Sequence, residues 1–182
     1  MKTRRSAVSL TLEEPGPDAG ELRGIIEIAS RVPDHGKLAP WRFVLWEKPA
    51  REAMHGALLD LLDSLEHIED KPKKRAGTDK LLHAPCVVAV ISQAAEHPKI
   101  PVWEQQLSAG AACMNMLIGA NSRGYEAQWL TAWYVYEDTA REILQLNQGE
   151  RIAGIIHIGS TSTPKTKRAR PDIDDILSIR TA

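Results

Sequence analysis

Cysteine is scarce in this sequence, and the spacings of common metal and disulfide sites are missing. The two cysteines, Cys86 and Cys113, fall in an apolar run and in a helical pattern, so we expect two buried thiols rather than a bridge. The six histidines include no pair with the spacing of metal ligands. This use of cysteine is typical of the reducing cytoplasm, where we expect the protein to reside.

Several binding and catalytic motifs are also lacking. No Gly-x-Gly-x-x-Gly follows a strand pattern and no Walker-type phosphate loop occurs, which argues against Rossmann and P-loop nucleotide sites. No Gly-x-Ser-x-Gly motif is present, so an α/β serine hydrolase is not indicated. The sequence therefore favours neither a hydrolase nor a metalloenzyme.

Long apolar segments and a strong net charge are absent as well. The basic N-terminal segment, residues 1–10, has the charge of a signal peptide, but Glu13–Gly16 interrupts the apolar run that such a signal needs. No other segment reaches the length of a membrane span, so we expect a soluble protein. The net charge of −1 argues against nucleic-acid binding, although residues 71–75 and 165–170 form local basic clusters.

Hydrophobic periodicity predicts a single α+β domain over residues 1–182. The 182 residues, 43% of them hydrophobic, suffice for one core, and no repeat or linker divides them. Strands and helices mix without a strict β-α-β order, which favours α+β. We expect strands at 41–46, 85–92, 126–132 and 151–159, and helices at 18–29, 51–66, 103–123 and 138–146, with a short helix that ends at 83.

The chain ends are expected to differ from this regular middle. Residues 1–17 indicate an extended arm with a rigid break at Pro15–Pro17. Residues 71–75 indicate a solvated loop or the start of a helix, with phosphate contact as the less favoured interpretation. The apolar piece at 173–179 has no evident partner within the chain and could pair with another subunit.

One stretch, residues 31–46, combines a helix end, a polar loop and the start of a strand. Arg31, His35 and Lys37 lie within seven positions of each other at this joint, so a rigid frame could present cations to an anionic ligand. From the stretch alone, a turn capped by Asp34 and His35 is the favoured interpretation.

Three stretches together resemble the nitroreductase family of flavoproteins, in particular its short YdjA-like members. They are Arg4-Arg5-Ser6-Ala7, the joint Arg31-x-Pro33-Asp34-His35 with Pro40-Trp41-x-Phe43, and residues 99–110. They occur in the family's order and at about its separations, so the resemblance covers nearly the whole chain. It implies a central, mainly antiparallel sheet flanked by helices, with the C-terminal segment exchanged in a homodimer.

The resemblance also implies a cofactor, FMN, and a set of residues that bind it. Arg4, Arg5 and Ser6 match residues that hold the phosphate and the ring edge, and a bidentate arginine suits a phosphate. Arg31 and His35 match flavin contacts, with His35 reaching the flavin of the opposite subunit. The remaining matches are Trp129, Leu130 and Thr131 over the ring, Arg168 and Arg170 as further phosphate ligands, and Ala120, Asn121, Ser122, Arg123, Gly124 and Tyr125 for NADH or NADPH.

Each match also has a plainer interpretation. Paired arginines are usually surface charge, Trp129 would be an ordinary core aromatic, and the 120–125 segment is simply the end of a helix. The chain further departs from the family in three places. Only residues 1–3 precede Arg4, where many members carry a helix, so either this member is shorter or its start lies upstream. Val8 stands where some relatives have a cation, so Arg31 or Lys37 would supply that charge.

The third departure is Glu126, in the family's glycine-rich turn, where its side chain would narrow the turn or place a carboxylate at the pocket rim. The resemblance as a whole implies an FMN-dependent oxidoreductase that uses NADH or NADPH to reduce nitroaromatic or quinone-like acceptors by a ping-pong hydride transfer. The alternative from another class is a non-catalytic flavin- or nucleotide-binding protein that keeps the fold.

Overall fold

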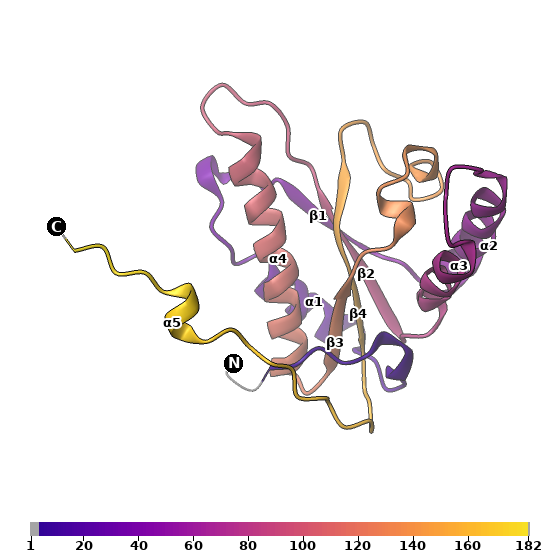
Figure 1. Cartoon of the computed structure of the whole chain (residues 1–182), viewed down its shortest axis with the longest axis horizontal. Coiled ribbons are helices and arrows are strands. Elements are labelled where there is room, and N and C mark those ends of the chain that lie inside the picture. The colour runs from indigo at the N-terminus through magenta and orange to yellow at the C-terminus, as the bar shows by residue number, and fades with distance from the viewer. Residues whose placement is uncertain (1–3, 182) are drawn as a thin grey trace.

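A four-stranded antiparallel sheet forms the middle layer of the computed structural model, which describes residues 4–181 (Figure 1). The strands are β1 (Trp41–Leu45), β2 (Cys86–Ser92), β3 (Glu126–Leu130) and β4 (Arg151–Gly159), in the spatial order β1-β2-β4-β3. Every neighbouring pair is antiparallel. The predicted mainly antiparallel sheet is therefore confirmed, and all four strands lie where the periodicity placed them.

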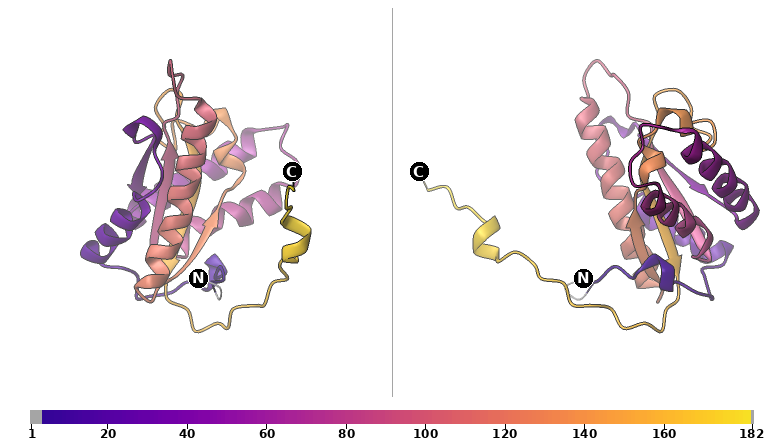
Figure 2. Two further views of the ribbon diagram at one scale, coloured as in Figure 1. Left: turned by 90° about the vertical axis from the view of Figure 1, so that its left-hand side faces the viewer. Right: turned by 45° about the vertical axis from the view of Figure 1, so that its right-hand side comes forward.

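Helices cover both faces of this sheet. Helices α1 (Ala19–Ala29) and α4 (Val102–Ser122) lie on one face, and α2 (Lys48–Ser64) and α3 (Lys71–Asp79) lie on the other (Figure 2). All seven residues of β2 are buried, as expected for a strand that is apolar on both sides and central in the sheet. Val88 and Ile156 belong to the core beneath α1 and α4, whereas Ala89 and Ile155 belong to the core beneath α2.

Helix α1 begins with a side-chain cap, and its backbone lies close to that of α4. Asp18 and Glu21 form a reciprocal capping box at the start of α1, where the predicted helix begins. A Cβ built on Gly119 would lie 3.3 Å from the Ile25 carbonyl oxygen, so the small residue lets the two backbones approach. Gly124, with φ of +87°, ends the α4 segment as expected for a C′ glycine.

One predicted helix is wrong. Residues 138–146 form only a 3₁₀ turn, Asp138–Ala140, followed by hydrogen-bonded turns. Gln145 has a left-handed φ of 52°, which a continuous helix cannot contain. The Arg141 guanidinium donates to the carbonyl oxygens of Asn147 and Glu150 and so ties the segment into a loop. Tertiary hydrogen bonds therefore override the local helical pattern.

The basic cluster at 71–75 opens a helix rather than forming a loop. Its first turn is capped by the Asp70 side chain, which accepts from the Lys73 amide. A 3₁₀ turn, Lys80–Leu82, follows α3 and is the short helix that the sequence placed before 83. These two elements bring several lysines to one side of the sheet.

Both chain ends run outside the sheet. The N-terminal arm follows β3, with the Ala7 amide donating to the Ala127 carbonyl, and Glu13 then forms an isolated bridge with Ser160. Residues 164–181 are exposed, but Lys165 still contacts Glu126 of β3. The tail beyond it extends away from the body, with one short helix, α5 (Ile173–Ile176) (Figure 1). Pairing of this tail with another subunit stays a prediction. Within residues 4–181, no helix has the length and apolar character that crossing a membrane requires.

Candidate functional site

The N-terminal arm and β3 run side by side and together border two cavities. Arg4 lies near the start of β3 and Leu10 near its end, because the arm follows the strand in the same direction. The first cavity, which we call the arm cavity, contains Arg4 and Glu126. The second, the lysine cavity, contains Leu10 and Leu130. With a rise of about 3.3 Å per residue, Glu126 and Leu130 are about 13 Å apart along the strand.

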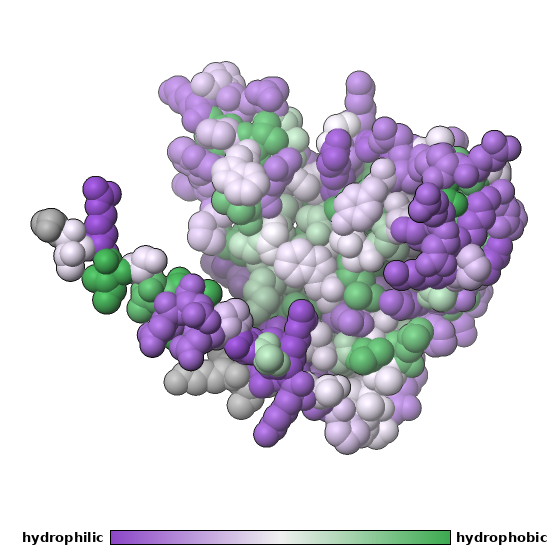
Figure 3. Space-filling view, in the orientation of Figure 1, coloured by the Kyte–Doolittle hydropathy of each residue, from purple (hydrophilic) through white to green (hydrophobic). Residues whose placement is uncertain are grey.

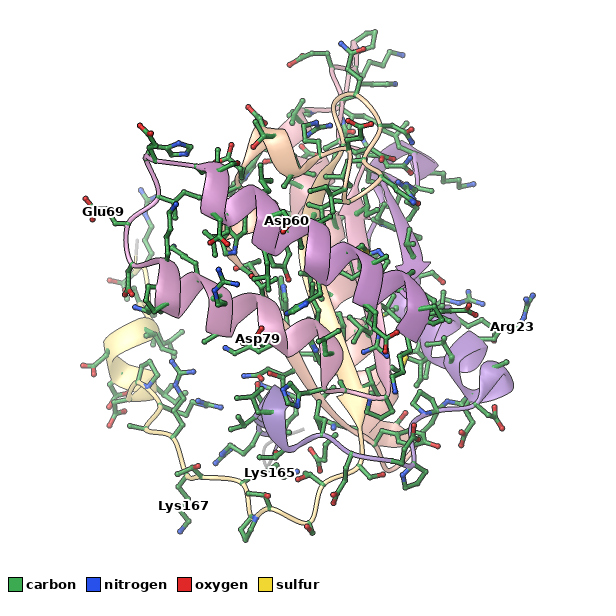
Figure 4. The ribbon with its side chains drawn as sticks, turned by 90° about the vertical axis from the view of Figure 1, so that its right-hand side faces the viewer. Arg23, Asp60, Glu69, Asp79, Lys165 and Lys167 are labelled. Atoms are coloured by element: carbon green, nitrogen blue, oxygen red, sulfur yellow. The ribbon has the colours of Figure 1, made fainter. Side chains whose placement is uncertain are left out.

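The arm cavity has a volume of about 410 Å³ and mixed charge. Lys165 Nζ lies 2.6 Å from Glu126 Oε1, and Figure 4 shows Lys165 beneath the arm while Lys167 points outward from the tail. Arg4 Nη1 and Glu126 Oε2 are buried and have no hydrogen-bond partner among residues 4–181. Buried polar atoms are nearly always paired, so Arg4 Nη1 is suited to an anionic ligand group, whereas Glu126 Oε2 requires a hydrogen-bond donor. Its lining residues are Arg4, Ile118, Asn121, Ser122, Gly124, Tyr125, Glu126 and Lys165.

Four of the six residues predicted to bind NADH or NADPH line the arm cavity together with Arg4. The four are Asn121, Ser122, Gly124 and Tyr125. Ala120 is buried in the core, and Arg123 lies beside Gly24 of α1. The Tyr125 hydroxyl donates to Glu21 at 2.6 Å, and this hydrogen bond raises the pKa of Tyr125 to about 12. The structure thus joins the predicted nucleotide stretch to the predicted phosphate arginine.

The lysine cavity has a volume of about 360 Å³ and lies at the other end of β3. Leu130 and Thr131, both predicted ring contacts, line it. Its basic groups are Lys73, Lys74 and Lys80, from α3 and the following 3₁₀ turn, and its remaining lining residues are Leu10, Ala76, Gly77, Ala132, Trp133, Tyr134, Ile155 and His157. Apolar walls with a few basic groups are suited to a flat, partly polar ring system.

His157 forms part of the buried wall of the lysine cavity. Its side chain comes from β4 and is 1% exposed, and its Nδ1 has no partner in the described part of the chain. Burial, reinforced by Arg51, Lys80 and His83, lowers the pKa of His157 to about 4. The imidazole is therefore neutral at physiological pH and can donate or accept one hydrogen bond toward the cavity.

Sequence reasoning missed the lysines of this second cavity. For the cluster at 71–75, which contains Lys73 and Lys74, the sequence favoured a solvated segment over a ligand contact. Lys80 was not considered. The signal that could have found them is helical spacing, since 73, 77 and 80 fall on one face of a helix. The missing information was which face of the sheet that helix covers.

Trp129 does not line either cavity. Alternation along β3 turns Trp129 toward the opposite face of the sheet from the lysine cavity, where its indole Nε1 donates to the Ala153 carbonyl at 3.2 Å. A Cβ on Gly154 would collide with this indole, so the ring lies directly over the glycine. The side chain is 37% exposed. The structure thus separates Trp129 from Leu130 and Thr131, with which the resemblance grouped it.

Arg31 and His35 lie apart from both cavities, near α4. His35 Nδ1 is 2.7 Å from Glu104 Oε2, and the Arg31 carbonyl accepts from the Asn115 amide at 2.9 Å. Both residues are exposed. Neither Arg31, His35 nor the nearby Lys37 is among the residues that line the arm cavity or the lysine cavity. Within one chain, the structure therefore does not bring the joint together with the arm.

The other predicted phosphate ligands are also outside the two cavities. Arg5 Nη1 donates to the Arg4 carbonyl, and Ser6 is exposed. Arg168 and Arg170 are exposed on the tail beyond Lys165. Lys165 belongs to the same basic segment of the tail, 165–170, as these two arginines, and it is the tail cation that lines the arm cavity.

One face of α4 presents apolar residues to the surface. Trp103 is 66% exposed and Leu107 is 53% exposed, and the half-buried Gly110, Ala111, Met114 and Ile118 continue the same stripe. Figure 3 shows hydrophobic residues along this helix with hydrophilic residues around them, and a second apolar group on the tail. Such an exposed stripe marks a surface for association. In residues 4–181, no group of three or more His, Cys, Asp or Glu could hold a metal ion.

Comparison with known proteins agrees with this architecture. The family "Nitroreductase family" matches residues 1–160. The Escherichia coli K12 protein named "Putative NAD(P)H nitroreductase YdjA" is 31% identical over 164 residues, covering 90% of this chain and 86% of the relative. A nitroreductase-like family protein from Bacillus cereus superimposes with a TM-score of 0.83 at 25% identity, covering 100% of this chain and 94% of that one.

A more distant solved structure carries a ligand. It is a nitroreductase with bound FMN from Bacteroides fragilis, with a TM-score of 0.75 at 18% identity and coverage of 99% of this chain and 96% of that one. At this identity the likeness concerns the fold. The predicted nitroreductase fold is confirmed by these superpositions.

Proposed function

Because the chain belongs to the nitroreductase family, we propose that it is an NAD(P)H-dependent oxidoreductase that binds FMN along β3. The observation that carries this proposal is the pair of cavities at the two ends of the edge strand β3, one bordered by α4 and the other by α3, so that the cofactor would pass over the arm at the sheet edge. The arm cavity offers Arg4 and Lys165 to a phosphate, and the lysine cavity offers apolar walls to a ring. The B. fragilis nitroreductase, which shares the fold, contains bound FMN.

The residues present fit this cofactor. Arg4 Nη1 is a buried donor without a partner among the described residues, and an unpaired buried donor is costly unless a ligand satisfies it. Asn121, Ser122 and Tyr125 donate to groups within the chain, so Arg4 and Lys165 are the groups of this cavity that a phosphate would contact. Because Asn121, Ser122, Gly124 and Tyr125 surround Arg4, we assign them to the phosphate end of the flavin rather than to a separate nicotinamide site.

The lysine cavity would hold the ring and adjust its electronic properties. Lys80 is the basic group we place at the ring edge, since Val8 cannot supply a charge there. A cation near the pyrimidine edge favours the reduced flavin, because reduction places negative charge at that edge. His157 stays neutral in this wall and can hydrogen-bond the ring without adding charge.

Bound FMN would supply the redox chemistry, accepting a hydride from NADH or NADPH and passing two electrons to a second substrate. The protein itself needs no nucleophile for this reaction. Its residues bind the phosphate, orient the ring and exclude water from one side of it. Donor and acceptor would use the same open face in turn, which gives ping-pong kinetics with nitroaromatic or quinone-like acceptors.

We further propose that the site is completed in a homodimer. Arg31 and His35 are exposed and contact Asn115 and Glu104 of α4, beside the apolar stripe of this helix. A second copy packed on the stripe would therefore bring its flavin site close to them. The exposed tail could cross to the same partner. The two buried, unbridged cysteines are consistent with our expectation of a cytoplasmic location.

Flavin binding by an Arg4→Gln variant tests the proposal. Loss of a charge-assisted hydrogen bond costs about 1.5–3 kcal/mol, so FMN affinity should fall about 10- to 100-fold while riboflavin affinity changes little. Arg23→Gln is the matched control, because Arg23 is an exposed arginine of α1 (Figure 4). Equal loss of both flavins in Arg4→Gln, or no flavin binding by the unmodified protein, would contradict the assignment.

Turnover separates the enzyme from a protein that only binds flavin. The FMN-loaded protein should oxidise NADH or NADPH when a quinone or a nitroaromatic acceptor is added. A binder would show the flavin spectrum and no NAD(P)H oxidation. Glu126 at the cavity rim is the residue that favours this second candidate, since its carboxylate alters the phosphate end of the site.

A further inference from the structure

The charges of the arm cavity are incompletely balanced. It contains two cations, Arg4 and Lys165, and one carboxylate, Glu126. Glu126 Oε1 pairs with Lys165 at 2.6 Å, while Glu126 Oε2 and Arg4 Nη1 are buried without partners in the described chain. Arg4 and Glu126 thus share one cavity without a direct hydrogen bond between their side chains.

The Glu126 carboxylate supplies the negative charge that pairs with Lys165 in the arm cavity. Its side chain is 21% exposed and that of Lys165 is 35% exposed, so the pair is shielded from solvent more than a surface ion pair is. Lys165 belongs to the otherwise exposed tail, and this contact joins the tail to β3. The carboxylate therefore uses the lysine that a bound phosphate would use.

We propose that Glu126 competes with the phosphate of the flavin for Lys165, so that binding of FMN requires the Glu126–Lys165 ion pair to open. The inference rests on the proposed function. A phosphate monoester carries a charge of about −1.5 to −2 at neutral pH and would be repelled by a carboxylate in the same partly buried cavity. Glu126 thus sets how tightly the protein retains its cofactor.

Glu126→Gln removes the charge and keeps the side chain's shape. Flavin-free protein is titrated with FMN and with riboflavin, and binding is followed by flavin fluorescence. Removal of one like charge should tighten FMN binding about tenfold, and riboflavin binding should not change because riboflavin has no phosphate. Glu27→Gln is the control, since it makes the same change in net charge at an exposed site on α1.

Two further measurements identify the mechanism. In the double variant with Lys165→Gln, the gain from Glu126→Gln should shrink, because the two residues act through one ion pair. Inorganic phosphate should raise the Tm of flavin-free Glu126→Gln more than that of the unmodified protein. Glu126→Ala provides the same comparison if the glutamine variant does not fold.

The possible outcomes separate this inference from the proposed function. If Glu126→Gln binds FMN no more tightly than the unmodified protein, Glu126 only anchors the tail, and the competition is refuted while flavin binding stands. If neither protein binds flavin, the proposed function fails. In that case the phosphate-dependent difference in Tm still decides whether Glu126 and an anion compete for the cavity.

Discussion

The buried His157 should make the stability of the flavin-free protein fall on mild acidification. Burial beside Arg51 and Lys80 lowers the pKa of His157 from its usual 6.5 to about 4. The unfolded chain then binds a proton between these two values that the native protein does not bind. Stability therefore decreases as the pH falls from 6.5 toward 4, and it is fully retained above 6.5.

The size of this effect follows from the shift. Each pKa unit corresponds to about 1.36 kcal/mol, so at about pH 5 the native state should have lost about 2 kcal/mol through His157 alone. His157→Leu removes the titrating group and keeps an apolar side chain in the wall. The variant should lose about 2 kcal/mol less than the unmodified protein between about pH 7.5 and pH 5, whatever its absolute stability.

Urea unfolding of the flavin-free proteins, followed by tryptophan fluorescence, measures this difference. The unmodified protein is measured in parallel at both pH values as the reference. If His157→Leu loses as much stability on acidification as the unmodified protein, His157 is not a buried neutral imidazole, and its assigned place in the cavity wall is wrong.

Three other predictions concern the frame of the fold. Glu150 accepts from Arg42 at 2.7 Å through both carboxylate oxygens, which holds the pKa of Glu150 at about 2. Its contribution to the free energy of unfolding is therefore present above about pH 4.5 and lost as the pH falls toward 2. Glu150→Gln should cost about 1–3 kcal/mol at neutral pH in urea unfolding and should weaken the loss of stability between pH 4.5 and pH 2. Gly154→Ala should displace the Trp129 indole, cost about 1–3 kcal/mol and shift the tryptophan emission, whereas unchanged emission would contradict the packing. Burial raises the pKa of the Cys86 thiol to about 11 and that of the Cys113 thiol to about 12. Both should therefore resist a thiol reagent in the native protein and react only after unfolding.

Local patterns predicted most of the frame from sequence. The apolar, β-branched run at 86–91 indicated a strand, and the helical pattern from residue 18 indicated α1. These features are encoded by neighbours in the chain. The 138–146 segment was predicted wrongly because its conformation depends on hydrogen bonds from Arg141 to residues beyond the segment.

The candidate site was only partly predictable for the same reason. Arg4 and the Leu130–Thr131 segment were identified through the family resemblance, not through any local physical signal. Lys80 and Lys165 were not singled out, because their proximity to β3 depends on how α3 and the tail fold back on the sheet. Trp129 and Leu130 point to opposite faces of the sheet because side chains alternate along a strand. The sequence analysis used this alternation to find strands but did not use it to divide the predicted flavin contacts.

The exposed tail has a consequence for how the protein responds to dilution. Ile173, Ile176, Leu177 and Ile179 are between 58% and 81% exposed, so a single chain leaves four large aliphatic side chains in water. If a second copy covers them, part of the folding free energy is released only on association. The Tm would then rise with protein concentration, and dilution alone would release the tails to proteases. For such a chain, expression level becomes a determinant of stability.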